Sequence, residues 1–273
     1  MTVSDLAAST HVVDAHAHIF TKDMPLRNNP RHAPTYDHTL ADFEKTLDAH
    51  GVTHAVLAAA SPWADYNDYL IESISGNPRF RGTVILYPNV ERYTLQQMAR
   101  EGIVGVRMHM IGLPELPDIS TFEYRRMFRR IADRGWHIHL HCEGHHLPEL
   151  LPHFERTGVN LVVDHLGRPD PVEGINSAGF KALLRLMENG RTWVKASGHF
   201  RLGKPSTGYL QEFIRQTGNT RLIWGSDCPF VGDEANANYG SSLKWFLEAV
   251  PSPSDRARIL GQNAMELFFK TDG

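Results

Sequence analysis

Short apolar runs alternate along the chain with longer segments in which apolar residues recur every three or four positions. The first kind of pattern predicts buried β-strands, and the second predicts amphipathic helices. Strands are predicted over residues 11–18, 54–60, 83–87, 103–108, 137–142, 161–165, 193–197 and 222–227. Helices are predicted to follow them over residues 40–50, 65–75, 95–100, 122–134, 147–156, 180–188, 209–217 and 241–250, with a last helix over 262–268.

This alternation predicts parallel strands covered by helices, and eight units are enough to close an α/β barrel. No linker rich in Gly, Ser or Pro divides the chain, so residues 1–273 are predicted to form one domain. The segments after the predicted strands are long, and in such a barrel they lie on the face that carries active sites. Residues 20–39 are a candidate lid, with a plain surface loop as the alternative.

Composition narrows the class of protein. The 273 residues are 41% hydrophobic and include five tryptophans, enough for a sizeable core. A formal net charge of -3 without a basic run argues against a nucleic-acid partner. No apolar window reaches the roughly 18 residues of a membrane span. Residues 1–5 do not resemble a signal peptide, and two cysteines make a disulfide framework implausible, so we expect a reduced, cytoplasmic protein with buried thiols.

Polar residues gather at the ends of several predicted strands, and sixteen residues of the chain are histidines. In the first strand Asp14, His16 and His18 are spaced two apart, so a regular pleat would point all three the same way. Two histidines with this spacing can bind one cation, although two surface histidines would give the same pattern. In the fifth strand His141 lies nearest the end, in the predicted site, and His139 lies one layer deeper as an interior histidine.

The sixth and eighth predicted strands end in His165 and Asp227. A lone aspartate at a strand end is typically a cap or a turn residue. Here, however, five polar groups converge from four predicted strands: His16, His18, His141, His165 and Asp227. Such convergence at one end of a barrel favours a site over unrelated caps.

Four segments carry a resemblance to a known family: residues 14–18 (DAHAH), 164–169 (DHLGRP), 194–198 (VKASG) and 224–227 (WGSD). With them the chain resembles the amidohydrolase superfamily, and within it the branch of 2-pyrone-4,6-dicarboxylate lactonase, sulfomuconolactone hydrolase and sugar-acid lactonases. The similarity extends over nearly the whole chain, to residues 263–268. It implies a distorted (β/α)8 TIM barrel that hydrolyses a small anionic lactone, and it leaves a homo-oligomer open.

Carried over by position, the resemblance also implies roles for individual residues. Asp227 would be the base that activates water, and His16, His18 and His165 would surround the carbonyl group or a metal. The substrate carboxylates and the ring would meet a further set of residues, namely Arg107, Arg168, Arg201 and Ser61. Trp63 and Tyr66, after the second strand, could stack on a flat ring or simply pack at the start of a helix.

The arginines have alternatives when only the residues are considered. Arg168 lies between a glycine and a proline and could brace a turn, and Arg201 could be solvated. Arg107 ends an apolar strand, where an unpaired charge would be costly, so it requires a partner. A bidentate substrate carboxylate meets that need.

Two departures from the branch concern its chemistry. The dicarboxylate lactonase works without a metal and has a tyrosine where this chain has His141. The histidine completes a set of His16, His18, His141 and Asp227 that suits one zinc or similar divalent ion with a water, unless His141 only hydrogen-bonds the substrate. Those lactonases also have a further arginine after the fourth strand, where residues 109–117 are apolar with one acid. A substrate with one anionic group and one apolar or sulfonated arm is therefore at least as plausible as a dicarboxylate.

Three functions remain open: a lactone hydrolase, a metal-dependent decarboxylase of the same superfamily, and a barrel that binds an acidic metabolite without catalysis. For the first, Asp227 would accept a proton from water, and a bound metal would lower the pKa of that water towards about 7. His165 or the metal would stabilise the oxyanion, which is typically worth about 3–4 kcal/mol. Residues 164–168 and 194–198 favour the lactonase branch over the decarboxylases.

Overall fold

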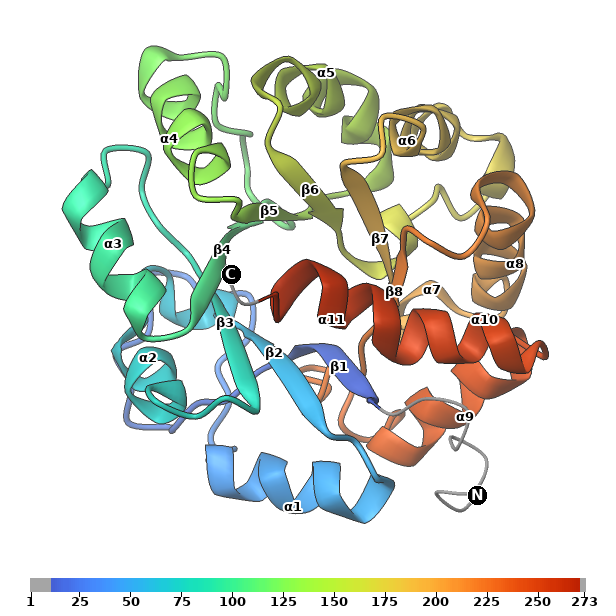
Figure 1. Cartoon of the computed structure of the whole chain (residues 1–273), viewed down its shortest axis with the longest axis horizontal. Coiled ribbons are helices and arrows are strands. Elements are labelled where there is room, and N and C mark those ends of the chain that lie inside the picture. Colours follow the sequence, from blue (N-terminus) through green and yellow to red (C-terminus); the bar gives the residue numbers. More distant parts are fainter. Residues whose placement is uncertain (1–10, 271–273) are drawn as a thin grey trace.

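Eight parallel strands form one sheet in sequence order in the computed structural model, which describes residues 11–270. The strands are β1 (Val13–Ala17), β2 (His54–Ala58), β3 (Phe80–Val84), β4 (Ile103–His109), β5 (His137–His141), β6 (Asn160–Val163), β7 (Thr192–Ala196) and β8 (Leu222–Trp224). Figure 1 shows them around a central axis inside a ring of helices. The predicted (β/α)8 barrel is confirmed, whereas residues 1–5, which were considered for a leader, lie outside the described residues.

The ring of helices consists of α1 (Leu40–His50), α2 (Asp68–Ile74), α3 (Arg92–Arg100), α4 (Phe122–Ala132), α5 (Leu147–Thr157), α6 (Ala178–Met187), α8 (Ser206–Thr217) and α9 (Tyr239–Ala249). The segment after β7 also contains a short helix, α7 (His199–Leu202), where the sequence predicted only a loop. Among the helices of residues 11–270, none has the length and hydropathy that crossing a bilayer requires.

Two strands differ most from their predicted bounds, each ending three residues early, for identifiable reasons. β3 starts earlier than predicted. It ends at Val84, because the Asn67 side chain forms hydrogen bonds with the backbone of the next residue, Ile85. Its amide donates to the Ile85 carbonyl (2.9 Å) and its oxygen accepts from the Ile85 N–H (3.1 Å). β8 ends at Trp224, because Asp227 has a left-handed backbone (φ 65°) that turns the chain towards β1.

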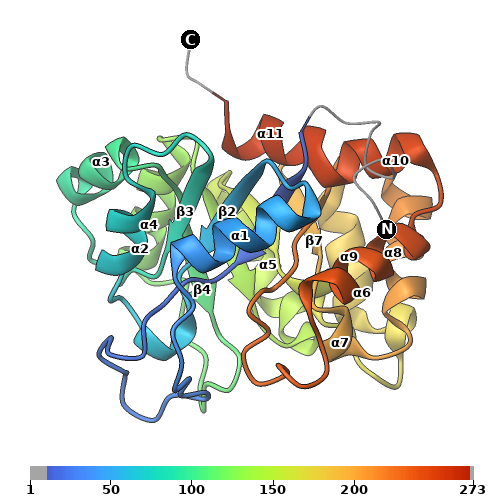
Figure 2. The same ribbon diagram turned by 90° about the horizontal axis from the view of Figure 1, so that it is seen from below.

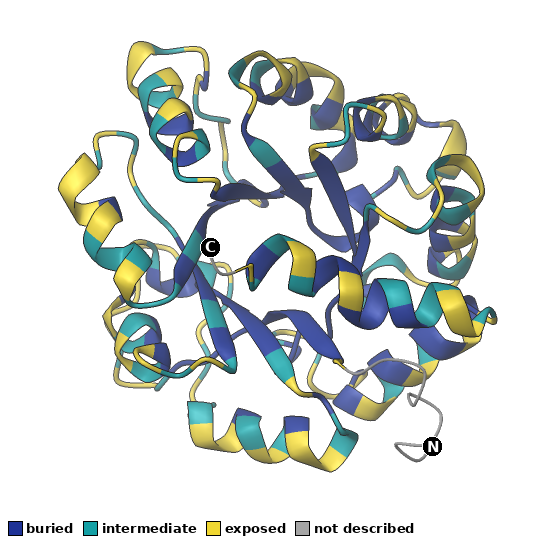
Figure 3. Ribbon diagram, in the orientation of Figure 1, coloured by how far each residue is buried: buried dark blue, intermediate teal, exposed yellow. Residues whose placement is uncertain are grey.

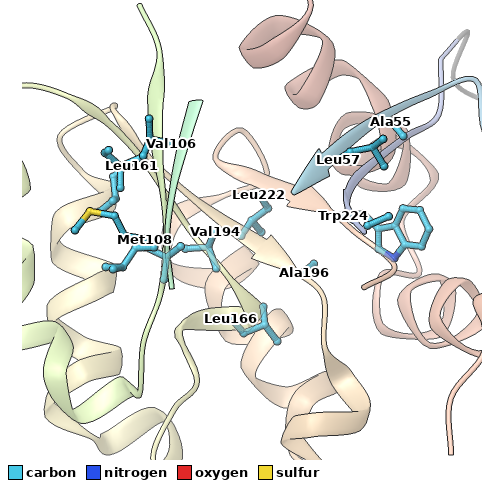
Figure 4. Close-up of a cluster of buried hydrophobic side chains, with 14 of the residues drawn as sticks. Ala55, Leu57, Val106, Met108, Leu161, Leu166, Val194, Ala196, Leu222 and Trp224 are labelled. Carbon is cyan, nitrogen blue, oxygen red and sulfur yellow. The ribbon is translucent and has the colours of Figure 1, made fainter. Parts of the chain in front are cut away.

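The main core lies between the strands and the helices. Side chains from β2, β4, β6, β7 and β8 pack there with the inner faces of the helices, as Figure 4 shows for Leu57, Met108 and Trp224. Figure 3 shows the same division, with buried residues on the strands and on the helix faces turned towards them. Full burial of one such large apolar side chain contributes about 1.5–3 kcal/mol.

A C-terminal segment closes one end of the barrel. It consists of α10 (Pro253–Ala257), a π-helical turn η6 (Arg258–Gln262) and α11 (Asn263–Phe268). Ala264 and Phe268 join a second core cluster with the interior residues Val13 and Ala15, and the Phe268 ring lies 4.8 Å from that of His137. Figure 2 shows α10 and α11 at one end of the molecule and the long loops at the other. A site in the barrel must therefore open on the loop side.

The barrel closes between β1 and β8 without a regular ladder. One isolated bridge joins Ala17 to Cys228, and two backbone hydrogen bonds of 2.8 Å flank it, from the His18 N–H to the Cys228 carbonyl and from the Asp227 N–H to the His16 carbonyl. We call this junction of residues 14–18 with residues 226–228 the closing seam.

Asp14 does not share a face with His16 and His18, which corrects the expectation from a regular pleat. The register of β1 shifts between Asp14 and Ala17, so the side chains before and after the shift alternate out of phase. The Asp14 carboxylate instead accepts hydrogen bonds from the Ser226 N–H (2.9 Å), the Ser226 hydroxyl (2.6 Å) and the Tyr239 hydroxyl (3.0 Å). Its role is to hold the closing seam together.

Candidate active site

A cavity at the loop end of the barrel gathers most of the predicted site residues. Those that line it are His18, Ser61, Arg107, His141, His165, Arg168, Arg201 and Asp227. His16 lies beneath it with no exposed surface. A much larger open groove, of about 1410 Å³, runs beside α11 at the opposite end, but it contains none of these residues. We therefore place the candidate active site in the loop-end cavity.

Asp227 lies at the centre of this cavity among three imidazoles. Its Oδ1 is 3.5 Å from Nε2 of His16 and 3.5 Å from Nε2 of His18, and its Oδ2 is 3.9 Å from Nε2 of His165. Oδ2 also accepts a hydrogen bond of 2.7 Å from Nε of Arg201. Burial raises the pKa of Asp227, but the histidines and the permanent cation of Arg201 outweigh it and hold the pKa well below its usual range. Asp227 is therefore an ionised carboxylate.

The backbone and neighbouring side chains orient each imidazole. Nδ1 of His18 lies 2.7 Å from the carbonyl oxygen of Ala58, which can only accept, so His18 carries a proton on Nδ1 and directs Nε2 at Asp227. Nδ1 of His165 lies 2.9 Å from the Ser197 hydroxyl. Burial lowers the pKa of His165 to about 4, so its imidazole is neutral at pH 7.

A buried charge network supports the site from below. Nζ of Lys195, on β7, lies 2.8 Å from Nδ1 of His16, 2.9 Å from Nδ1 of His139 and 3.1 Å from Oδ1 of Asp164. Oδ2 of Asp164 is 3.7 Å from Nε of Arg107. Burial lowers the pKa of Lys195 to about 8, against the opposing effect of Asp164. As an ammonium group, Lys195 only donates, which places the ring proton of a neutral His16 on Nε2.

Sequence reasoning assigned no role to Lys195 or to Asp164, although both lie in segments that carried the family resemblance. A signal was present, because each is a charged residue inside or directly after an apolar strand. Both are buried in the structure. A charged pair in such a place requires partners, and this pair finds them in each other and in the histidines.

Three of the four predicted metal ligands form a compact group. The donor atoms of His16, His18 and Asp227 all lie within 4.8 Å of one another, and a second such group is formed by His16, Asp164 and His165. A tetrahedral zinc ion with bonds of about 2.0–2.1 Å keeps its ligand atoms about 3.4 Å apart. The separations of 3.5 Å between Asp227 Oδ1 and the two Nε2 atoms match this geometry. Nε2 of His18 and the Asp227 carboxylate face each other as well, so either a proton or a cation lies between them.

His16 satisfies this fit only with its ring proton on Nδ1, because Nε2 must then present a lone pair. Lys195 in its neutral form, or Asp164 at 3.5 Å, would accept that proton. His141, the predicted fourth ligand, belongs to neither group in the described part of the chain. Its ring packs between those of His109 (4.9 Å) and His165 (4.7 Å). Residues His16, His18 and Asp227 thus fit a divalent cation once the ring proton of His16 has moved to Nδ1, whereas His141 stands to one side.

The three predicted arginines all border the cavity, and each has a partner in the protein. Arg107 donates to the Ala59 carbonyl (2.8 Å) in addition to its contact with Asp164. Arg168 pairs with Glu143 through contacts of 3.0 and 3.3 Å. Arg201 is not solvated, because it bridges Asp227 and Asp233 with two contacts of 2.7 Å. Arg107 therefore has the partner that its burial requires before any ligand binds.

Ser61 and Trp63 lie in one turn, η2 (Ser61–Trp63), but face different ways. Ser61 lines the cavity, whereas Trp63 is buried outside it, stacked on Phe20 with ring centroids 4.7 Å apart. The Trp63 indole N–H donates to the Met24 carbonyl (3.2 Å). Trp63 therefore anchors the 20–39 segment rather than a substrate ring. Sequence reasoning missed six further lining residues, namely Arg31, His32, Ala60, Pro62, His109 and Val231.

The first strand of this (β/α)8 barrel leads into a pair of histidines, and a third histidine and an ionised aspartate face them. This combination defines a hydrolase of the amidohydrolase type. A family model with the description Amidohydrolase (Amidohydro_2) matches residues 13–270. The chain belongs to this family.

Similar proteins cover nearly the whole chain. The 4-sulfomuconolactone hydrolase of Hydrogenophaga intermedia is 26% identical over 93% of this chain and 88% of its own length. The 2-pyrone-4,6-dicarboxylate hydrolase of Comamonas testosteroni is 27% identical over 94% of this chain and 90% of its own. A solved structure of a probable 2-pyrone-4,6-dicarboxylic acid hydrolase from Acinetobacter baumannii, with citric acid bound, has a TM-score of 0.90 and 31% identity, covering 95% of this chain and 99% of that one.

Proposed function

We propose that this chain is a lactonase, which opens the cyclic ester of a small carboxylate-bearing lactone by adding water. The observation that carries the proposal is an ionised carboxylate, Asp227, held among three imidazoles in a cavity bordered by arginines. The relatives named for sulfomuconolactone and for pyrone dicarboxylate support the same reaction class. The citric acid in the Acinetobacter baumannii relative supports a carboxylate-binding cavity.

In this reaction Asp227 takes a proton from water as the water oxygen bonds to the lactone carbonyl carbon. The ring carbon–oxygen bond then breaks, and the proton held by Asp227 passes to the leaving oxygen. His165 is neutral and has Ser197 at Nδ1, so with the Ser197 hydroxyl donating, its Nε2–H is free to donate to the developing oxyanion. One such donor typically lowers the activation free energy by about 3–4 kcal/mol.

We infer that His16, His18 and Asp227 also hold one divalent cation, and that two nitrogens and one oxygen suit zinc. When bound, such an ion lowers the pKa of a coordinated water towards about 7. We assign His141 to the substrate side of the cavity, where its buried Nε2 has no partner among the described residues. In that position it can donate a hydrogen bond to the lactone.

Recognition of the substrate falls to the cationic wall of the cavity. Arg107, Arg168 and Arg201 present guanidinium groups that can hold carboxylates in bidentate fashion, and Ser61 adds a hydroxyl. The opened product gains a new carboxylate from the ester. The same arginines hold that group until the product leaves.

The test compares Asp227→Asn with Asp233→Asn. Both aspartates accept from Arg201 at 2.7 Å, but only Asp227 faces the imidazoles, so the second variant controls for the loss of an arginine partner. Hydrolysis of 2-pyrone-4,6-dicarboxylate and of 4-sulfomuconolactone is followed by base consumption at constant pH. We expect Asp227→Asn to lower kcat by about 10²–10⁴-fold, the usual contribution of a general base, and Asp233→Asn to change it less than tenfold.

Three outcomes would contradict the proposal. Equal activity of the two variants would remove Asp227 from the chemistry. Release of carbon dioxide without base consumption would identify a decarboxylase. Binding of these lactones without turnover by the unmodified protein would identify a non-catalytic barrel.

A further inference from the structure

The charges that border the cavity do not balance. Four guanidinium groups line it, those of Arg31, Arg107, Arg168 and Arg201, whereas Asp227 is the single carboxylate among the lining residues. Three of these arginines are paired with acids. Arg31 differs, because within residues 11–270 its guanidinium group makes no hydrogen bond or ion pair with the protein.

Arg31 lies on the 20–39 segment, which is held in place on both sides of it. On one side the Arg27 N–H donates to the Pro62 carbonyl (2.8 Å). On the other, the Tyr36 hydroxyl donates to Glu234 (2.9 Å). These contacts tie the segment to the loops after β2 and β8, so in this structure it forms a rim of the cavity.

The neighbouring glycines show how closely this rim packs against other loops. A Cβ added to Gly232 would lie 2.5 Å from the ring of His32, and Gly232 has a left-handed backbone (φ 84°). A Cβ added to Gly112, in the loop after β4, would lie 3.9 Å from Cδ of Arg31. The side chain of Arg31 therefore lies beside the loop after β4, where it lines the cavity, and its neighbour His32 packs on the loop after β8.

Arg31 is an exposed cation close to two other cations of the cavity. Burial lowers its pKa, and the positive charges of Arg168 and Arg201 lower it further, against the opposing effects of Glu143 and Asp233. Like charges that converge on one cavity repel one another unless a ligand neutralises them. Since Arg168 and Arg201 already have acidic partners, the cation of the group without one is Arg31, which is exposed and can receive an anion from solvent.

We propose that Arg31 is a specificity-determining residue, which holds a second anionic group of the substrate at the mouth of the cavity, away from the reacting carbonyl. This inference rests on the proposed lactonase function and narrows its substrate class to lactones with two anionic groups. Arg31 would also supply a cation that the apolar loop after β4 lacks, because residues 109–117 contain no lysine or arginine.

The test measures KM and kcat for Arg31→Met, Arg31→Lys and Arg27→Met. Arg27 is the matched control, because it is an exposed arginine on the same segment and does not line the cavity. The substrates are 2-pyrone-4,6-dicarboxylate and its two monocarboxylate analogues. For the dicarboxylate we expect Arg31→Met to raise KM about tenfold with kcat nearly unchanged, as for loss of one charge-assisted contact far from the reacting bond.

The monocarboxylates locate the contact. For the analogue that lacks the group bound by Arg31, the KM of Arg31→Met should stay within twofold of the unmodified protein, whereas the other analogue should show the tenfold rise. Arg31→Lys should recover part of the loss, and Arg27→Met should change none of these constants.

The inference is overturned if Arg31→Met leaves KM for the dicarboxylate unchanged, or if it raises KM for all three substrates by the same factor. The same rise of KM in Arg27→Met would also overturn the inference, because the positive charge of the 20–39 segment would then attract anions without a specific contact from Arg31. Failure of the proposed function would look different, because the unmodified protein would then hydrolyse none of the three lactones.

Discussion

The buried pair of Lys195 and Asp164 allows a quantitative test of how the site is supported. The two charges lie 3.1 Å apart, and neither side chain has exposed surface. At an effective dielectric constant of about 20, Coulomb's law gives an attraction of about 5 kcal/mol at this distance. Taking both charges out of water offsets much of that gain, but removing one partner leaves the other charge buried and uncompensated.

We therefore expect Lys195→Met and Asp164→Asn each to lower the free energy of unfolding by about 3–5 kcal/mol. Asp164→Asn should fall at the lower end, because the pKa of Lys195 is already lowered to about 8 and the amine can lose its proton. The double variant should cost less than the sum of the two single changes by at least about 2 kcal/mol, since residues in direct contact are not additive.

Urea unfolding of the four proteins, followed by circular dichroism, measures this coupling. The control is the cycle of Lys244 and Glu248, a pair 2.6 Å apart in which both side chains are 61% exposed. Pairs of this kind couple by less than about 1 kcal/mol. If the coupling of Lys195 and Asp164 is no larger than that of the exposed pair, the buried network does not stabilise the site as argued.

Three further predictions follow from the same structure. Purified protein should contain about one zinc per chain, lost in His18→Ala and retained in His141→Ala, as measured by elemental analysis; equal loss in both would restore His141 as a ligand. The free energy of unfolding should fall steeply as the pH drops from 6.5 to 5, because the unfolded chain then binds more protons than the folded one. Burial lowers the pKa of six histidines on β1, β4, β5 and the turn after β6, namely His16, His109, His137, His139, His141 and His165. Each adds up to about 1.4 kcal/mol per pH unit, and a flat profile would contradict this. Phe268→Ala should cost about 3–5 kcal/mol in urea unfolding while kcat is kept, because α11 packs at the end of the barrel away from the cavity; a large loss of kcat in the folded variant would refute this separation.

The barrel and most of its site follow from local patterns. The alternation of apolar runs and helical periods is repeated eight times, so errors of a few residues at single elements do not change the architecture. His18, His141, His165 and Asp227 could be placed because strand ends of a parallel barrel meet on one face. Those residues all line the cavity.

What the pattern could not predict depends on irregular backbone or on distant contacts. The register shift in β1 turns Asp14 away from His16 and His18, and no local residue preference marks it. Arg31 reaches the cavity because the segment around it is tied to distant loops, by Tyr36 among others. Trp63 is amphipathic and suits a ring-binding surface as well as an anchor, so its packing on Phe20 was decided by the fold.

The closing seam and the reacting groups occupy the same few residues. His16, His18 and Asp227 supply both backbone groups for the hydrogen bonds that join the first strand to the last and the side chains that meet at the candidate cation site. A molecule or ion that binds both His18 and Asp227 therefore stabilises the closing seam, the junction of the barrel that has no regular ladder. Occupancy of this position by a ligand should slow amide hydrogen exchange at His18 and Asp227 more than in the continuous ladder of β4 and β5. Local opening of the barrel at this junction should therefore be rarest while a ligand is bound.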